Sequence, residues 1–275
     1  MDMRIAVAAQ GFGSDFQGLV CAQLRSLLAP GQLLVECAIP RWKEQDFVRT
    51  RLLGLLEGDA RPTALIGICL RPDRETVAGF RAAGVPVVLI DERAEGASTV
   101  ASDSLTGGYL AGRYLAGKGR KAIAIVSGPV RDYNAMQRMR GVAKALSESG
   151  LPLPAESVVE APEYSYRDGV NAMARVLGGP GKVDAIICTA GDVCAAGLLA
   201  GARERRVKVP EELAVVGYDD APLAATTDPP LTTVGQSLEQ VAGQALRLVT
   251  QDTTAILLKP TIVLLEPKLV VRASA

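Results

Sequence analysis

The sequence predicts an α/β fold made of two doubly wound lobes, each a parallel sheet with helices on both faces. The first observation is length, because 275 residues are more than one compact sheet usually needs. The second is a series of short, fully apolar runs, typical of strands that are buried on both faces. The third is that stretches with apolar residues three and four positions apart separate these runs, as in covering helices.

The apolar runs and the amphipathic stretches alternate along most of the chain. The predicted strands are residues 4–9, 33–38, 64–70, 85–90, 122–126, 157–161, 185–188 and 214–216. The predicted helices include residues 16–28, 47–56, 105–116, 138–149, 166–177 and 193–205. Because crossovers between parallel strands are right-handed, each half should close as a doubly wound lobe. After Pro229-Pro230 the pattern changes, and we expect a helix at 238–249 and a terminal strand pair within 262–271.

Helix stop signals suggest where the lobes divide. Gly117 and Gly119 follow the helical stretch 105–116, which places a crossover near Lys118 to Arg120. We therefore expect an N-terminal lobe of residues 1–119 plus about 236–258. The remaining segments, 120–235 plus about 259–275, form the C-terminal lobe.

Composition excludes several classes of function. Thirty basic residues balance thirty acidic ones, so no net field attracts nucleic acid or an anionic membrane. The chain has no histidine, which removes Ser-His-Asp and Cys-His nucleophiles and the commonest zinc ligand. We therefore expect a binding protein, not an enzyme, with no cofactor and no metal.

Cysteine usage and the start of the chain bear on its location. The five cysteines are odd in number and lack a CxxC pair, which indicates buried, reduced thiols. Met1 leads almost directly into the first strand and leaves no room for a signal peptide, and no apolar run is long enough for a membrane span. These features favour a cytoplasmic protein.

Three short motifs resemble nucleotide-binding or catalytic motifs, and each has a simpler interpretation. The Gly11-to-Phe16 loop has two glycines of a dinucleotide fingerprint but Phe16 in place of the third, so it is a ligand-facing loop, a plain turn or, least favoured, a nucleotide site. Gly112 to Lys118 fits GxxxxGK by coincidence, because it lies on a helix. Asp219 and Asp220 follow a strand and diverge, which favours hydrogen bonding to a ligand over a turn role or catalysis.

Two long segments are more specific than these motifs. They are Val209 to Asp220, with the sequence VPEELAVVGYDD, and Pro229 to Gln236, with the sequence PPLTTVGQ. Supporting segments are Asp103-Ser104 with Gly107-Gly108, 123–129, 138–141, 184–192 and 269–274. Together they resemble the effector-binding core of the LacI/GalR family of bacterial transcription regulators. The resemblance implies a periplasmic-binding-protein-like fold of type I, with three hinge crossings between the lobes.

The resemblance also implies a set of ligand contacts in the second lobe. Arg138 matches a family arginine that donates to ligand oxygens, and Asp219 matches an aspartate that accepts from ligand hydroxyls. Tyr164 falls where the family often places an aromatic on the ligand, with a plain core residue as the less favoured alternative. Gln236 and Asn134 match polar contacts.

Other contacts are expected in the first lobe and at one departure from the family. Phe16 resembles a wall of the cleft, and Asp15 and Gln10 are expected to add hydrogen bonds. Where the family usually has Asn-Asp, this sequence has Gly191-Asp192, which removes one amide. Asp192 either contacts the ligand or caps the following helix, and the sequence favours neither role.

The function implied is that of a sensor. A sugar or another small polar ligand would bind between the lobes of a homodimer, and closure would change how a headpiece meets operator DNA. Such headpieces precede the core, whereas here the first core strand starts at Arg4, so this chain alone is not expected to read DNA. The alternatives are an exported sugar-binding transport receptor and, less favoured, a nucleotide-dependent enzyme that uses the Gly11 loop.

Overall fold

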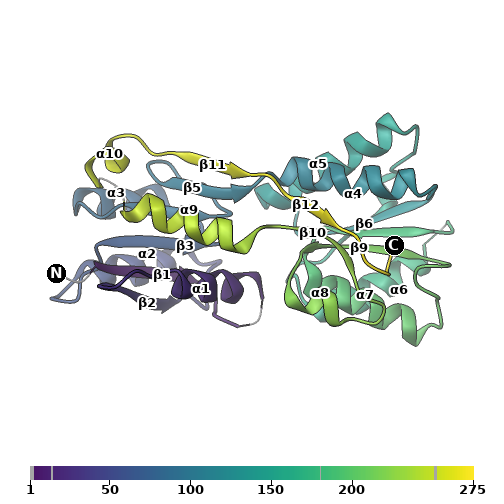
Figure 1. Ribbon diagram of the computed structural model, residues 1–275, viewed down its shortest axis with the longest axis horizontal. Helices are drawn as coiled ribbons and strands as arrows, with labels where there is room; N and C mark the ends of the chain where they lie inside the picture. Colours follow the sequence, from purple (N-terminus) through teal and green to yellow (C-terminus); the bar gives the residue numbers. More distant parts are fainter. Residues whose placement is uncertain (1–2, 14, 180, 251–252) are drawn as a thin grey trace. The chain divides into compact units, whose positions relative to one another are not determined.

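A computed structural model describes residues 3–13, 15–179, 181–250 and 253–275. The chain divides into two compact units, each with its own six-stranded sheet (Figure 1). Unit 1 consists of Met1–Ser102 and Ser237–Leu265, and unit 2 of Asp103–Gln236 and Glu266–Ala275. The backbone therefore passes from one unit to the other three times, after Ser102, Gln236 and Leu265.

Unit 1 is a fully parallel sheet. Its strand order is β11-β5-β4-β3-β1-β2. The strands are β1 (Met3–Ala9), β2 (Gln32–Ala38), β3 (Ala64–Ile68), β4 (Val87–Ile90), β5 (Ser98–Ser102) and β11 (Ile262–Leu265). The helices are α1 (Phe16–Ser26), α2 (Gln45–Leu53), the 3₁₀ turn η1 (Gly54–Leu56), α3 (Arg74–Ala82), α9 (Leu238–Thr250) and α10 (Thr253–Leu258).

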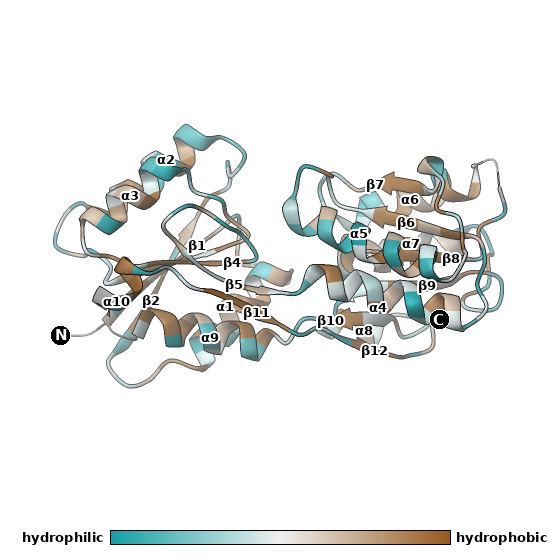
Figure 2. Ribbon diagram, turned by 90° about the horizontal axis from the view of Figure 1, so that it is seen from above, coloured by the Kyte–Doolittle hydropathy of each residue, from teal (hydrophilic) through white to brown (hydrophobic). Residues whose placement is uncertain are grey.

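Side chains alternate across the unit 1 sheet, so each face has a separate core. Along β1, Ile5 and Val7 face the core that α1 and α9 cover, whereas Ala6 and Ala8 face the core under α2 and α3. Figure 2 shows α2 and α3 on one side of the strands and α9 on the other. The doubly wound architecture predicted from the apolar runs is confirmed.

Unit 2 repeats the architecture with one antiparallel edge. Its strand order is β12-β10-β9-β8-β6-β7, and only β12 runs against its neighbour. The strands are β6 (Ile123–Ser127), β7 (Val158–Glu160), β8 (Ala185–Cys188), β9 (Ala214–Asp219), β10 (Thr232–Gly235) and β12 (Lys268–Val270). The helices are α4 (Ser104–Gly117), α5 (Tyr133–Glu148), the 3₁₀ turn η2 (Ala155–Ser157), α6 (Tyr166–Leu177), α7 (Asp192–Glu204) and α8 (Pro222–Thr226).

Close packing of α4 on α5 shapes one face of unit 2. A Cβ atom added to Gly108 would lie 1.9 Å from the carbonyl oxygen of Arg138, and one added to Gly141 would lie 2.0 Å from that of Leu105. These distances are far below van der Waals contact, so the two helix backbones touch through their glycines. This packing fixes the height of Arg138 above the sheet.

The division into units differs from the expected boundaries of 119/120 and 258/259. Helix α4 belongs to unit 2, because its glycines pack on α5, and the first crossing therefore falls after Ser102 instead of near residue 118. The last crossing falls after Leu265. The expected terminal strand pair is also corrected: β11 pairs with β5 in unit 1 and β12 with β10 in unit 2.

The cysteines follow the expectation closely. All five are free thiols, and four of them are buried while Cys69 is half-buried. Burial raises the pKa of the Cys188 thiol well above its ordinary value, and burial together with the Glu36 carboxylate raises the pKa of Cys21 to about 11. These thiols are therefore packing groups and not nucleophiles.

Candidate functional site

Polar residues gather where the parallel strands of unit 2 end. Strands β6, β8, β9 and β10 run in the same direction, so their carboxyl ends share one edge of the sheet. In doubly wound proteins this edge is where ligands bind. The residues at or just after these strand ends include Gly128, Thr189, Asp219 and Gln236.

Arg138 reaches this edge from α5 and is held by two contacts. Its side chain is buried, with the residue only 8% exposed. One guanidinium nitrogen, Nη1, donates to the Thr189 carbonyl oxygen at 3.0 Å, and Cζ lies 3.9 Å from the centroid of the Tyr218 ring. A buried cation needs such partners, because an uncompensated charge in an apolar interior is costly.

Asp219 and Gln236 form the acceptor side of the site. Gln236 Nε2 donates to Asp219 Oδ1 at 2.6 Å. The Oε1 of Gln236 is buried and has no hydrogen-bond partner within the part of the chain that the structure describes. Because buried polar atoms are usually hydrogen-bonded, this amide oxygen can accept a hydrogen bond from a ligand.

Gly191 stands where the sequence resemblance led us to expect an amide side chain, and little space is left for a side chain there. Its φ of 94° is in the region that favours glycine, and a Cβ atom built on it would lie 2.8 Å from Asp219 Oδ2. Asp219 itself has a positive φ of 111°. The Asp219 carboxylate therefore lies close to where a side chain at position 191 would begin.

Asp192 ties the strand ends together. Its Oδ1 accepts from the Thr233 hydroxyl at 2.7 Å and its Oδ2 from the Ala221 backbone N–H at 2.8 Å. Burial and then the neighbouring Asp219 charge raise the pKa of Asp192 to about 8. Helix α7 begins at Asp192, after Gly191 as N-cap, and no side chain caps it. The helix-cap alternative for Asp192 is therefore wrong.

Tyr164 and Asn134 lie beside the same strand ends. The Tyr164 hydroxyl donates to the Asp132 carboxylate, and its ring covers Gly128, where an added Cβ would lie 2.3 Å from Tyr164 Cε1. Tyr164 has φ of 54°, an uncommon conformation for a large side chain. Asn134 is half-buried, one helical turn before Arg138 on α5.

The three remaining predicted residues belong to unit 1, at the carboxyl end of β1. Asp15 caps α1, since its Oδ1 accepts from the Gly18 N–H at 3.0 Å. Gln10 is exposed and its backbone N–H donates to the Gln17 side chain at 2.8 Å. Phe16 is half-buried and packs against the unit 1 core.

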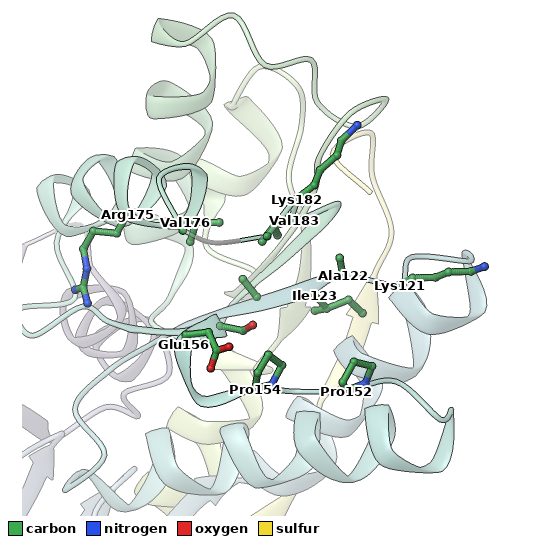
Figure 3. A pocket seen from close by; sticks show the side chains of 14 residues that line it. Lys121, Ala122, Ile123, Pro152, Pro154, Glu156, Arg175, Val176, Lys182 and Val183 are labelled. Atoms are coloured by element: carbon green, nitrogen blue, oxygen red, sulfur yellow. The ribbon is translucent and has the colours of Figure 1, made fainter.

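A hollow of about 340 Å³ lies elsewhere in unit 2, at the amino end of β6 (Figure 3). Ile123, Val176 and Val183 line it together with Pro152 and Pro154. Its charged lining residues are exposed. They are Lys121, Glu156, Arg175 and Lys182. None of the residues expected at the ligand site lines this hollow.

Sequence reasoning missed two residues that hold the site. Tyr218 is fully buried under Arg138, and the Thr233 hydroxyl donates to Asp192. Both residues belong to matched segments, but the sequence pattern assigned neither of them a role. The available signal was position, because Tyr218 directly precedes Asp219 at the end of β9 and Thr233 lies on the neighbouring strand β10. Within the described residues no cluster of three or more acidic, histidine or cysteine side chains could hold a metal. No described helix is long and apolar enough to cross a membrane.

Comparison with known proteins identifies the class. Residues 113–275 match the family of periplasmic binding protein-like domains, and the chain belongs to that family. A curated relative, the HTH-type transcriptional repressor PurR of Histophilus somni, is 31% identical over 192 residues, which are 69% of this chain and 57% of the relative. The chain thus spans little more than half the length of the curated relatives it matches.

The structure of the chain is also similar to solved structures of transcription regulators. The complex of the transcriptional regulator CelR with cellobiose superposes with a TM-score of 0.86 at 27% identity, covering all of this chain and 85% of that one. A LacI family regulator from Silicibacter pomeroyi gives a TM-score of 0.81 at 22% identity, covering 98% of both chains, which supports the fold alone. The chain has the effector-binding core of a LacI-type regulator, as its sequence motifs predict.

Proposed function

We propose that this chain senses a sugar or sugar derivative at the carboxyl edge of the unit 2 sheet and performs no chemistry on it. The observation that carries the proposal is the buried Arg138 together with the acceptors Asp219 and Gln236 at the same sheet edge. Sugars present neighbouring hydroxyls that both donate and accept hydrogen bonds. A guanidinium donates to them and a carboxylate accepts from them.

The chemistry of the acceptor side favours a ligand rich in donors. Asp219 accepts from Gln236 Nε2, and a carboxylate has room to accept several further hydrogen bonds. The buried Oε1 of Gln236 adds a second acceptor. A ligand with two adjacent hydroxyls would match both, whereas an anion would be repelled by Asp219.

The proposal includes a response to the ligand. We expect Gln10, Asp15 and Phe16 of unit 1 to complete the binding site when the two units close on the effector. The ligand shifts this equilibrium only by its differential affinity for the closed form. In a homodimeric regulator, closure would be coupled reciprocally to operator binding by a DNA-binding headpiece. The likeness to a cellobiose complex and to a repressor supports this assignment.

A thermal-shift screen tests the proposal. The chain is heated with cellobiose, other sugars, sugar acids, polyols, nucleosides, purine bases and nicotinamide cofactors, because a ligand that binds only the folded state raises the melting temperature. We expect a shift of several degrees with one class of sugar. A response to a purine base alone would replace the ligand class, and a response to a nicotinamide cofactor alone would overturn the sensor assignment.

Substitution of Arg138 then locates the site. Arg138→Ala should abolish the response to the compound that stabilises the wild-type chain. Arg175→Ala is the matched control, since Arg175 lies in the same unit at the amino-edge hollow. Calorimetry that finds unchanged affinity for Arg138→Ala would remove the site from the carboxyl edge.

A further inference from the structure

The ring of Tyr218 lies directly under the guanidinium of Arg138. The distance from Cζ to the ring centroid is 3.9 Å, well inside the reach of about 6 Å within which a cation and an aromatic face attract each other. Tyr218 is fully buried, so the contact is shielded from water. Such shielding strengthens the attraction relative to a surface pair.

Two contacts together fix the orientation of the guanidinium. The ring restrains the height of the guanidinium above β9. The bond from Nη1 to the Thr189 carbonyl restrains rotation in the plane, because the donors of the fork have fixed directions. With both in place, the direction of the remaining edge of the fork is determined.

The ring has room because residue 107 on α4 is a glycine. A Cβ atom added to Gly107 would lie 2.0 Å from the Tyr218 hydroxyl oxygen and 2.9 Å from Cζ. Any larger residue at 107 would therefore push the outer end of the ring. The next residue, Gly108, contacts the backbone of Arg138, so this pair of glycines sets both the main chain of Arg138 and the ring under its side chain.

Strand β9 links this arrangement to the acceptor side. Tyr218 packs into the core under α4 and α5, and the following residue, Asp219, ends the strand and bonds Gln236. Consecutive residues thus place the donor and the acceptor of the site.

We propose that Tyr218, for whose ring Gly107 leaves room, is a positioning residue that holds the guanidinium of Arg138 in the orientation that meets the effector. The proposal rests on the function proposed above, in which Arg138 contacts the ligand. It predicts that the aromatic face of residue 218 matters and its hydroxyl does not. Tyr218→Phe should therefore behave like the wild-type chain, whereas Tyr218→Leu should not.

The first measurement needs no ligand. The Nε–Hε resonance of Arg138, assigned by its loss in Arg138→Lys, is recorded by two-dimensional NMR in the free protein. A proton stacked on an aromatic ring resonates upfield, so we expect an upfield position in the wild-type chain and in Tyr218→Phe, and an ordinary position in Tyr218→Leu. The same position in all three would overturn the proposal whatever the ligand is.

The second measurement is affinity, by calorimetry with the sugar that the wild-type chain binds, cellobiose being the first probe. Tyr218→Leu should bind about tenfold more weakly, as expected for loss of a buried cation–π contact. Unchanged affinity in Tyr218→Leu, where Arg138→Ala has lost binding, would overturn the positioning role. If Arg138→Ala itself keeps full affinity, the proposed site fails while the NMR result still reports the contact.

A substitution at Gly107 tests the same contact independently, in case Tyr218→Leu does not fold. Gly107→Ala should displace the ring, move the Arg138 resonance and weaken binding. Adding Tyr218→Phe to Gly107→Ala removes the atom nearest the new methyl group, so part of the affinity and of the upfield shift should return. No recovery in the double variant would contradict the need for a glycine at position 107 beside the ring.

Discussion

At the carboxyl edge of the unit 2 sheet two ionisable side chains, those of Arg138 and Asp192, are buried and hydrogen-bonded, whereas the charged residues that line the apolar hollow at the amino edge are exposed. Arg138 and Asp192 are 8% and 1% exposed, and both have hydrogen-bond partners from other strands or loops. At the amino edge, Lys121 and Lys182 extend away from the hollow (Figure 3).

This contrast is the reason why we place the proposed site at the carboxyl edge and not at the hollow. Burying ionisable groups is costly unless they are paired or hydrogen-bonded, and a folded chain gains little from such groups over apolar ones. Their presence at this edge is therefore the observation on which the proposed site rests. Exposed lysines around apolar side chains carry no comparable cost, and an ordinary surface has many of them.

We expect the largest loss of stability from a substitution at the contact between α4 and α5, which supports Arg138. Gly108→Ala would place a methyl group 1.9 Å from the Arg138 carbonyl oxygen, and neither helix backbone can yield without separating α4 from α5. We expect the free energy of unfolding to fall by about 3 kcal/mol, the upper range for overpacked sites. Urea unfolding measures it.

Gly117→Ala is the control for this change. Gly117 ends the same helix and has nothing within 4 Å of an added Cβ. Alanine there should leave stability unchanged or slightly raised, because it restricts the unfolded chain. Equal losses in the two variants would mean that helix α4, and not its contact with α5, is sensitive.

The next effect separates the two edges by ligand affinity. Asp219→Asn keeps an acceptor for Gln236 Nε2 but removes the charge, so a ligand hydroxyl loses a charge-assisted bond. We expect affinity for the sugar found in the screen to fall roughly tenfold to a hundredfold. Glu156→Gln, the same type of change at the amino edge, should bind as the wild-type chain does. Calorimetry in which both variants bind equally well would erase the distinction between the edges.

A third effect concerns the pH dependence of stability. Folding keeps a proton on Asp192 up to about pH 8, whereas the unfolded chain releases it near the ordinary pKa of 3.8. The folded state therefore binds more protons at Asp192 between these values, so the contribution of Asp192 to the free energy of unfolding should fall as pH rises from about 4 to about 8 and level off above. The Asp192 contribution disappears in Asp192→Asn, whose amide can still bond Thr233 and Ala221.

Urea unfolding of both proteins at pH 5 and pH 8 checks this. The stability of Asp192→Asn relative to the wild-type chain should be higher at pH 8 than at pH 5. Asp219→Asn should reduce the same slope in part, since the Asp219 charge is the second cause of the raised pKa. Parallel pH profiles for Asp192→Asn and the wild-type chain would show that Asp192 is already ionised at neutral pH.

The fold was predictable from the sequence where strands are wholly apolar, and the misses have physical causes. Strand β5 was not predicted, because Ser98, Thr99 and Ser102 interrupt its apolar character although all three are buried. The Ser98 hydroxyl, for example, accepts from the Thr261 backbone, which no local pattern reveals. The first crossing between the units was predicted near residue 118 and lies after Ser102. The sequence pattern of helix α4 is the same whether the helix covers the sheet of unit 1 or that of unit 2, so the pattern could not assign it.

The candidate site was predictable only in part for a related reason. Motif resemblance selects Arg138 and Asp219, because they belong to matched segments. It cannot find Tyr218 as a partner of Arg138, since that contact joins residues eighty positions apart and depends on Gly107 being small. Nor could it choose between the two roles of Asp192, because the bond to Thr233 spans 41 positions.

We expect the smallest effect from a substitution at the amino edge, where the charged side chains are exposed. Lys182→Ser removes an exposed cation that rims the hollow and has no ion-pair partner among the described residues. Stability should change by less than about 0.5 kcal/mol, as for ordinary surface positions, and affinity for the sugar should not change. Calorimetry and urea unfolding measure both. Weaker sugar binding in this variant would mean that a hollow at the amino edge takes part in sensing, and burial of charge would then no longer separate the functional edge from the other.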